Sequence, residues 1–197
     1  MAKNERDKYL LKEEYKRFIE NTPEQYKLFW KIVFNAGLRI SEGLNLRATD
    51  ILWEENKLLI ATLKRKGHPI IPIIIPKDLI EELRIYIKES GSIWKNPVIN
   101  GRIWKFSRQF CWKIFKSICR KAGLNPKYSP HAARHFHGVM ISSITNGNMV
   151  EIKNRLRHSS IKSTEIYVHL SEKRQKELSN KIEEYMKLAR EIFKLQD

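Results

Sequence analysis

The sequence has few of the residues and segments that mark secreted or membrane proteins. Its two cysteines, Cys111 and Cys119, fall in one expected helix, so they form neither a disulfide framework nor a metal-binding quartet. The longest apolar run, Pro69 to Pro76, is short and contains Pro72, which excludes a transmembrane helix. The N-terminal MAKNERDKYLLKEE lacks the apolar core of a signal peptide. We therefore expect a reduced, cytoplasmic protein without a membrane partner.

Acidic residues are also scarce, with 22 Asp and Glu against 38 Lys and Arg, which gives a net charge of +16. Such an excess indicates a polyanionic partner, with nucleic acid as the first candidate. A basic surface that reflects only a Lys- and Ile-rich source proteome is the alternative. The sequence contains no nucleotide-binding loop and no acidic metal cluster. We therefore expect no cofactor and no metal.

The periodicity of apolar residues predicts an α+β fold that is mainly helical. A length of 197 residues with 42% hydrophobic residues suffices for one substantial domain or two small ones. Three short β-type runs, ILW, LLIATLK and PIIPIII, lie between Ile51 and Ile75 and predict a small three-stranded antiparallel sheet. Helical spacing predicts helices up to residue 20, from the Thr22 N-cap to Gly37, and over 77–90, 105–122 and 171–197.

The stretch from Pro130 to His169 carries most of the chemically informative residues. Ser129 and Pro130 are typical of an N-cap and a first helical position. On the helix that follows, His131, Arg134 and His135 fall at i, i+3 and i+4 and share a face. A helix N-terminus with an arginine and imidazoles is suited to hold a phosphate.

His158 and Tyr167 follow on separate elements. Nine steps of a 3.6-residue period cover two and a half turns, so the two side chains cannot share a face of one straight helix. The SSIKST segment between them predicts a helix break with a new N-cap at Ser163. Tyr167 should therefore lie on a short helix of its own.

The motifs HAARH, LRHSS and IYVH together resemble the catalytic domain of the tyrosine recombinases, the phage-type integrases. That family has a His-x-x-Arg box, matched by His131 and Arg134, and a Leu-Gly-His-Ser-Ser box, matched at His158. Its nucleophilic tyrosine follows nine residues later, at Tyr167. The resemblance implies the fold of that domain and a site-specific recombinase or integrase that cleaves and rejoins double-stranded DNA. The reaction passes through a covalent 3′-phosphotyrosine and needs neither metal nor ATP.

Two further catalytic residues follow from the resemblance. GLRISE, from Gly37 to Glu42, is close to the family box that carries the first catalytic arginine, which implies that Arg39 binds phosphate and that Glu42 is its buried partner. The family's general-acid lysine lies in the hairpin between the second and third strands. Alignment of LKRKGHPIIPI places it at Lys64, with Lys66 as the alternative.

Other positions are not assigned a catalytic role. We expect His135 to be structural, packed beneath the active face, and we give His137 no catalytic role. Arg157 replaces the glycine usual before His158, and we expect it either to crowd that turn or to contact phosphate. Ala133 replaces a common leucine, a change that affects packing.

The resemblance covers about residues 10–190 but only the catalytic half of a typical recombinase. We therefore expect residues 1–197 to form a single catalytic domain without the family's N-terminal DNA-clamping domain, as either a fragment or a minimal enzyme. A homo-oligomer, a dimer or tetramer on DNA, is expected. Residues 171–197 either pass to a neighbouring protomer or pack on their own chain.

Three other functions compete with recombination. Type IB topoisomerases use similar residues to relax DNA, although the HAARH and LRHSS boxes favour the integrases. A DNA-binding or regulatory domain could retain the fold with little strand exchange. An RNA-binding module is the third, but the sequence has no matching aromatic motif.

Overall fold

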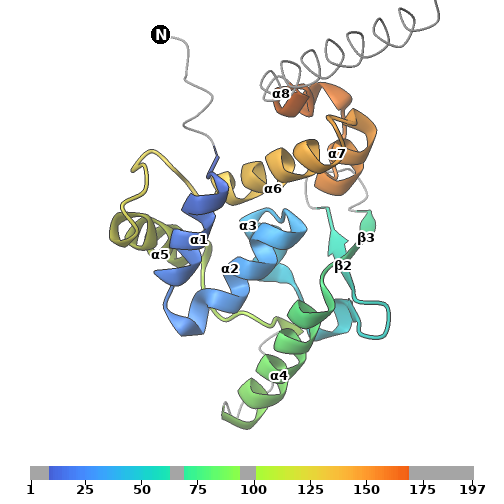
Figure 1. Ribbon diagram of the computed structural model, residues 1–197. Coiled ribbons are helices and arrows are strands. Elements are labelled where there is room, and N and C mark those ends of the chain that lie inside the picture. The colour runs from blue at the N-terminus through green and yellow to red at the C-terminus, as the bar shows by residue number, and fades with distance from the viewer. Residues whose placement is uncertain (1–8, 63–68, 94–100, 169–197) are drawn as a thin grey trace, which may run out of the picture.

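The computed structural model describes residues 9–62, 69–93 and 101–168 (Figure 1). Within them the predicted α+β fold is confirmed: the chain is mainly helical and has a small antiparallel sheet of three strands in the order β1-β2-β3. The helices are α1 Lys12–Glu20, α2 Glu24–Ala36, α3 Ile40–Asn45, α4 Lys77–Ile93, α5 Arg108–Lys121, α6 His131–Ile144, α7 Met149–Leu156 and α8 Glu165–Val168. Two short 3₁₀ helices are η2 Ala48–Asp50 and η4 Ile161–Ser163, and the strands are β1 Ile51–Leu52, β2 Lys57–Ala61 and β3 Ile70–Ile74.

Helix α2 is the centre of the packing, in contact with α1, α3, α4 and α6. In Figure 1 it lies between α5 and the sheet. Its apolar residues come from several faces, so neighbours bury it on several sides. The rings of Phe18, Trp30 and Phe115 meet edge-on or tilted, with centroids 5.0–5.6 Å apart. This aromatic core fixes α1 and α5 against α2.

The chain leaves α2 through Gly37, as the sequence predicts. Gly37 has a left-handed backbone with φ +57°, and a Cβ atom there would lie 2.5 Å from Cδ2 of His137. Both the conformation and the close approach require glycine. At the other end the predicted N-cap is wrong. The Thr22 hydroxyl donates to the Phe18 carbonyl at 2.7 Å, so it ends α1 and does not cap α2.

The sheet follows α3 and is built from the three predicted runs. Leu58 pairs with Ile51 on one side and with Ile73 on the other. β3 is the edge strand, where Pro72 is tolerated because its missing N–H faces away from β2. The Thr62 N–H and hydroxyl both donate to the Pro69 carbonyl, at 3.1 and 3.0 Å, which closes the base of the hairpin.

The last described elements, α6, α7, η4 and α8, form a small apolar cluster of their own. Ile152, Leu156 and Tyr167 are its buried members. Tyr167 does lie on a helix, α8, that is separate from α7. The predicted cap at Ser163 is wrong, however, since the Ser160 side chain accepts from the Lys162 N–H at 3.2 Å at the start of η4. At the start of α6 no side chain caps the helix, and the Ser129 carbonyl accepts from the Ala132 N–H at 2.8 Å.

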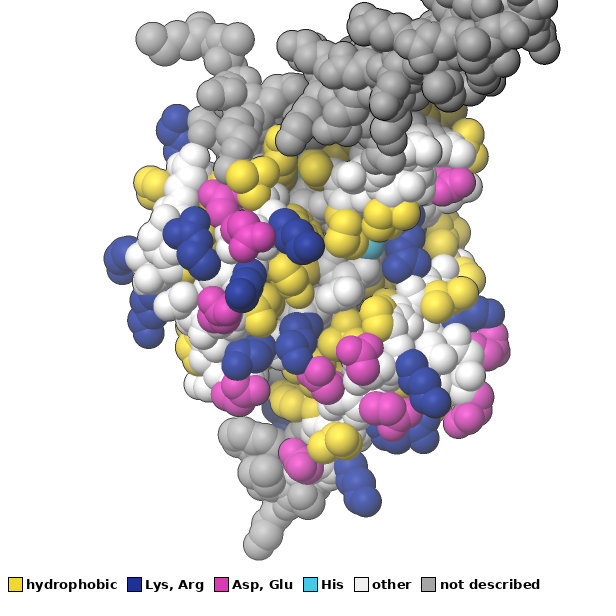
Figure 2. Space-filling view, in the orientation of Figure 1, with side chains coloured by type: hydrophobic (Ala, Val, Ile, Leu, Met, Phe, Trp, Pro, Cys, Tyr) yellow, Lys and Arg dark blue, Asp and Glu magenta, His cyan; other side chains and the backbone are white. Residues whose placement is uncertain are grey.

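On the face shown in Figure 2, basic and acidic side chains are intermixed, with apolar side chains between them. Among the described helices, none combines the length and the apolar character needed to cross a membrane.

Candidate active site

Arg39 and Glu42 sit at the start of α3 and hold each other. The Glu42 carboxylate reaches back to accept from the Arg39 backbone N–H at 2.8 Å, as in a capping box. Its other oxygen accepts from the Arg39 guanidinium at 2.6 Å. Glu42 is fully buried, whereas the Arg39 side chain keeps 19% of its surface exposed. Arg39 is therefore fixed at its inner end and accessible at the surface.

Arg134, from the first turns of α6, lies beneath Arg39. It is 1% exposed, and its guanidinium donates to the Gly37 carbonyl at 2.7 Å and to the Leu156 carbonyl. It also lies 3.8 Å from Glu42. Burial, with the nearby Arg157 and Arg39 charges, lowers the pKa of Arg134 to about 9, which leaves it protonated at neutral pH.

Arg157 is a second fully buried guanidinium in this cluster, after Arg134. Its backbone takes the left-handed conformation with φ +56°, as the C-cap of α7. The side chain is 0% exposed and donates to Glu42 at 2.9 Å, to Gly37 O at 2.9 Å and to Ala36 O at 3.2 Å. With the Arg155 carbonyl at 3.0 Å, both terminal nitrogens of Arg157 are occupied by Glu42 and backbone carbonyls, so no contact among the described residues supports a phosphate-binding role, and the turn keeps a strained left-handed backbone. Instead the side chain joins the end of α7 to the end of α2.

The three guanidinium groups decide the charge of Glu42. Burial by itself would raise the pKa of the Glu42 carboxyl, but Arg157, Arg39 and Arg134 together hold that pKa below its ordinary value. One carboxylate thus offsets one of three positive charges. The site keeps a positive excess, which suits a phosphate.

His158 follows Arg157 and faces the same cluster. Its Nδ1 lies 3.1 Å from the Thr164 hydroxyl, which fixes the ring. Burial, reinforced by the charges of Arg134 and Arg39, lowers the pKa of His158 to about 4. At neutral pH His158 is therefore an uncharged imidazole, which can form hydrogen bonds but adds no positive charge to the site.

Tyr167 lies next to His158, with its ring stacked against the imidazole, and its side chain points into the protein. Only 2% of it is exposed, and its ring packs against Gly138, where a Cβ atom would lie 2.4 Å from Cε1 of the tyrosine. Burial raises the pKa of Tyr167 to about 12, while Arg134 and Arg39 act in the opposite direction.

His135 contacts Tyr167, although the sequence predicts only a packing role for it. Its Nδ1 lies 2.9 Å from the Tyr167 hydroxyl. His131, one turn earlier, is exposed and meets the His135 ring edge-on at 4.7 Å. The His135–Tyr167 contact spans 32 residues. No local pattern could have indicated it.

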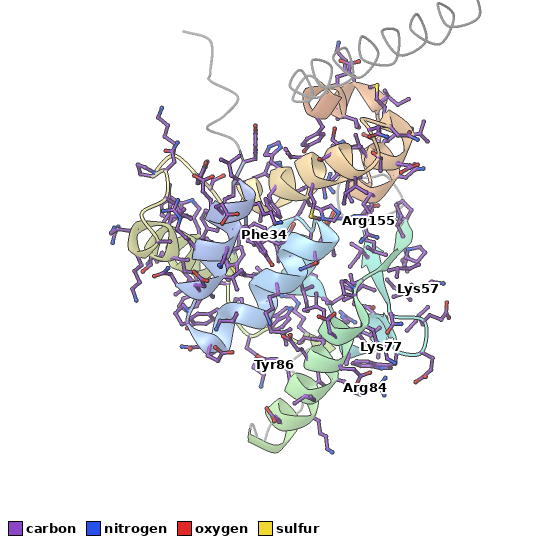
Figure 3. The ribbon with its side chains drawn as sticks, viewed as in Figure 1. Phe34, Lys57, Lys77, Arg84, Tyr86 and Arg155 are labelled. Atoms are coloured by element: carbon purple, nitrogen blue, oxygen red, sulfur yellow. The ribbon has the colours of Figure 1, made fainter. Side chains whose placement is uncertain are left out.

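The remaining predicted positions differ in what the structure says of them. Lys64 and the alternative Lys66 lie outside the described residues. His137 is 1% exposed and accepts from Arg155 Nε at 3.3 Å, in agreement with its non-catalytic assignment. Arg155 also donates to the Ile74 carbonyl at 2.8 Å, so α7 is tied to β3 (Figure 3). The strand that follows the hairpin is thereby held close to the segment that carries His158.

Arg39, His131, Arg134, His158 and Tyr167 thus converge from α3, α6 and the segment after α7. Burial and the arginines keep His158 in its neutral form, and the rings of His131, His135, Tyr167 and His158 form a chain of contacts. Such a site can bind an anion beside a hydroxyl and several imidazoles.

Known proteins share this arrangement of elements. The chain is 30% identical over 177 residues to tyrosine recombinase XerA of Pyrococcus furiosus, covering 86% of this chain and 60% of that protein. It is 26% identical over 175 residues to XerH of Campylobacter jejuni, covering 82% and 48%. The chain therefore spans less than two thirds of either relative.

Structural comparison agrees. The crystal structure of the XerH site-specific recombinase bound to palindromic difH substrate superposes with a TM-score of 0.75 at 22% identity, over 88% of this chain and 52% of that one. The sequence profile of the phage integrase family matches residues 8–174. This chain therefore belongs to the phage integrase family.

Proposed function

We propose that this chain is the catalytic part of a site-specific recombinase that cleaves and rejoins double-stranded DNA through Tyr167. The observation that carries the proposal is a cluster of five side chains. Arg39 and Arg134 meet at the buried carboxylate of Glu42, and His131, His158 and Tyr167 lie around them. Family membership and the DNA-bound XerH relative support it.

Arg39 and Arg134 would bind the scissile phosphate. Negative charge gathers on the non-bridging oxygens in the transition state, and planar guanidinium groups match those oxygens with paired donors. A guanidinium carries five N–H groups, so Arg134 can hold the carbonyls of Gly37 and Leu156 and still donate to phosphate. Arg39, the more exposed of the two, would make the first contact.

Tyr167 would then attack phosphorus and form the 3′-phosphotyrosine. Because only 2% of its side chain is exposed, attack requires the Tyr167 hydroxyl to move toward the phosphate. His131 and His158 would donate hydrogen bonds to the phosphate. We propose Lys64 as the acid that protonates the 5′ oxygen.

The test is incubation with nicked duplexes drawn from a pool of sequences, followed by a denaturing gel. We expect a covalent protein–DNA band with the wild-type chain and none with Tyr167→Phe, which removes the nucleophile and keeps the ring. A shifted DNA band without any covalent product, from every sequence in the pool, would indicate a binding domain. Relaxation of supercoiled DNA without exchange would indicate a topoisomerase-like activity.

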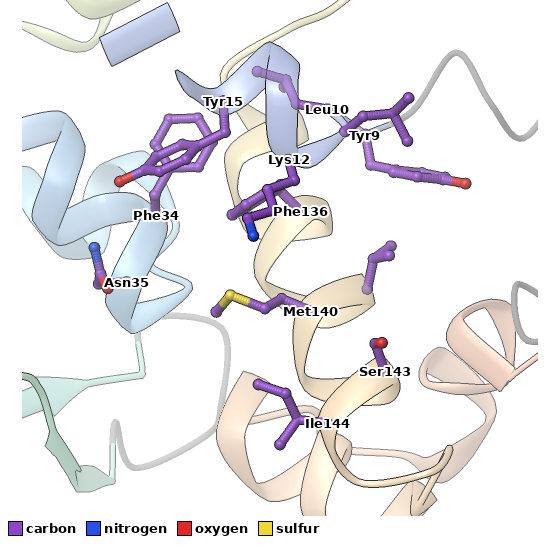
Figure 4. A pocket seen from close by; sticks show the side chains of 12 residues that line it. Tyr9, Leu10, Lys12, Tyr15, Phe34, Asn35, Phe136, Met140, Ser143 and Ile144 are labelled. Carbon is purple, nitrogen blue, oxygen red and sulfur yellow. The ribbon is translucent and has the colours of Figure 1, made fainter. Parts of the chain in front are cut away.

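We further propose that the enzyme works as a homo-oligomer joined by its C-terminal segment. A cavity of about 540 Å³ opens between α1, α2 and α6 and is lined mainly by apolar side chains, including Tyr15, Phe136 and Met140 (Figure 4). Residues 171–197 repeat apolar side chains at helical spacing, among them Leu178 and Ile182. We propose that this segment of one copy fills the cavity of the next.

Met140→Asp would test this assembly by placing a charge in the cavity. We expect it to abolish higher-order complexes on DNA in sedimentation velocity while single-site binding persists. Trp112→Glu, at a side chain that is 51% exposed on α5, is the control and should assemble normally. Assembly that survives Met140→Asp would place the interface elsewhere.

A further inference from the structure

We propose that Arg157 is a positioning residue for DNA cleavage, which occupies one oxygen of Glu42 and so keeps the phosphate-binding donors of Arg39 turned outward. The inference rests on the proposed function, because it adds a positioning residue to that same site. The family box has glycine at this position, so its motif assigns no role to the Arg157 side chain.

The two oxygens of the Glu42 carboxylate have different partners. Oε1 accepts from Nη1 of Arg39 at 2.6 Å. Oε2 accepts from the Arg39 backbone N–H at 2.8 Å and from Nη2 of Arg157 at 2.9 Å. Nη1 of Arg134 lies 3.8 Å from Oε2, which is too far for a hydrogen bond. Of the three guanidinium groups, Arg157 is thus the one that is bonded to Oε2.

Arg157 is itself held at both terminal nitrogens. Nη1 donates to the carbonyls of Ala36 and Arg155, at 3.2 and 3.0 Å. Nη2 donates to the Gly37 carbonyl at 2.9 Å as well as to Glu42. The side chain is 0% exposed. A guanidinium fixed in this way also fixes the orientation of the carboxylate that it contacts.

The orientation of Glu42 decides how Arg39 is held. A guanidinium and a carboxylate frequently pair through two parallel hydrogen bonds. Among the hydrogen bonds of the described residues, the Arg39 guanidinium reaches Glu42 through Nη1 alone, because Oε2 already accepts from two other donors. The Arg39 side chain keeps 19% of its surface exposed. Its remaining N–H groups can therefore point toward a bound phosphate.

Without Arg157, Oε2 would lose one of its donors. A second nitrogen of Arg39, or the nearby Nη1 of Arg134, would then be drawn to that oxygen. Either change turns a phosphate-binding guanidinium inward, away from the DNA.

The charge of Arg157 acts in the same direction as its hydrogen bond. Burial raises the pKa of the Glu42 carboxyl, and Arg157 is the strongest of the charges that lower this pKa. Removal of Arg157 would bring Glu42 nearer to protonation, and a neutral carboxyl would hold Arg39 less firmly.

The experiment compares single-turnover cleavage of two nicked duplexes of a sequence that the wild-type chain cleaves. One has an ordinary scissile phosphate, and the other has a methylphosphonate there, which carries no negative charge and so depends less on the arginines. Arg157→Gly removes the side chain and keeps the turn, since glycine readily adopts φ +56°. We expect it to slow cleavage of the phosphodiester by about 100-fold with DNA affinity unchanged, and to slow cleavage of the methylphosphonate far less. Arg39→Ala should show the same pattern.

Two further variants separate positioning from stability. Leu83→Ala creates a cavity at a buried residue of α4 and should cleave both substrates like the wild type, per folded molecule. Arg157→Lys keeps a positive charge beside Glu42, which preserves the fold if the glycine variant does not fold. Its single nitrogen cannot reproduce the planar fork that holds Glu42 and the end of α2. We expect a smaller defect that the methylphosphonate again relieves.

The pH profile on the phosphodiester is a second readout, and it decides the question if the wild-type chain does not cleave the methylphosphonate. In Arg157→Gly, Arg39 and Arg134 remain as the charges that face Glu42, and the pKa of its carboxyl rises. As the pH is lowered, the cleavage rate of this variant should therefore fall at a higher pH than that of the wild type.

Equal slowing of both substrates by the Arg157 variants, or wild-type rates on the phosphodiester, would overturn the inference and leave the proposed function intact. Where the pH profile decides, an unchanged acid limb has the same meaning. No covalent product from the wild-type chain on any sequence overturns both.

Discussion

At the scale of single residues, Glu42 is the point on which the site depends. It accepts from Arg39 and Arg157 and lies near Arg134, so its removal would leave three desolvated cations facing one another. A buried charge without its partner costs far more than the pair contributes. The positions of the three arginines therefore depend on their shared carboxylate, Glu42.

Arg157→Gly tests how much the interaction with Glu42 contributes to stability, and the substitution has two opposing effects. Glycine relieves the left-handed strain at φ +56°, which is worth roughly 1–2 kcal/mol. The loss of the bonds to Glu42 and to the end of α2 costs about 3–5 kcal/mol. We expect a net loss of about 1–4 kcal/mol in urea denaturation.

The control is Asn146→Gly, at a residue that has φ +57° and is exposed. It should change stability by less than about 0.5 kcal/mol. A stabilising effect of Arg157→Gly would mean that the hydrogen bonds of the Arg157 side chain contribute less to the free energy of unfolding than its backbone strain costs.

His137 predicts a pH dependence of stability. Burial, with the charges of Arg155 and Arg157, lowers its pKa from 6.5 to about 3. The folded chain holds His137 neutral while the unfolded chain protonates it below 6.5, so stability falls as the pH drops from 6.5 toward 3. The slope is about 1.4 kcal/mol per pH unit.

His137→Gln should remove this contribution. Between about pH 7 and about pH 5 the wild type should lose about 2 kcal/mol more than the variant, measured by urea denaturation at each pH. Val150→Gln, at an exposed position on α7, should retain the wild-type slope. Parallel curves for wild type and His137→Gln would show that His137 is not held neutral.

At the scale of elements, α6 and α8 are joined by the contact of Gly138 with the Tyr167 ring. Gly138→Ala should destabilise the chain by about 1–3 kcal/mol, because the added methyl group overlaps the ring. In a Tyr167→Ala background the ring is absent, and the same change should stabilise α6 by about 0.5–1 kcal/mol. Urea denaturation of the four proteins measures this change of sign. The same sign in both backgrounds would contradict the packing described.

At the scale of the whole molecule, the net charge of +16 predicts salt-sensitive DNA binding. Release of counterions from the phosphates should lower the affinity at least about tenfold between 50 and 200 mM salt, measured by fluorescence anisotropy. Tyr167→Phe should give the same slope, because the hydroxyl carries no charge. A flat salt dependence would contradict an electrostatic interface.

Local patterns in the sequence predicted much of this fold. The end of α2 at Gly37, the three short strands and the separate helix of Tyr167 all follow from periodicity or from glycine. Details that depend on distant contacts were missed. Thr22 and Ser163 have the chemistry of caps, but the Thr22 hydroxyl donates to the Phe18 carbonyl instead, and Ser163 ends η4 two residues before α8 begins.

The candidate site shows the same division. Its motif residues could be read from the sequence, and the structure brings those it describes together. The inward turn of Arg157 depends on Glu42, 115 residues away. The His135 contact depends on α8. Neither could be predicted, because each needs the tertiary fold to bring its partner into reach.

The bonds that hold the arginines have a consequence for folding. Arg134 reaches Gly37 across 97 residues, and Arg157 reaches Ala36 across 121. Contacts of such separation form late, since long loops must close before they contribute. During synthesis residue 157 also leaves the ribosome well after Glu42. A nascent or half-folded chain therefore has no assembled guanidinium cluster, and the site proposed to cleave DNA forms only once the whole fold is in place.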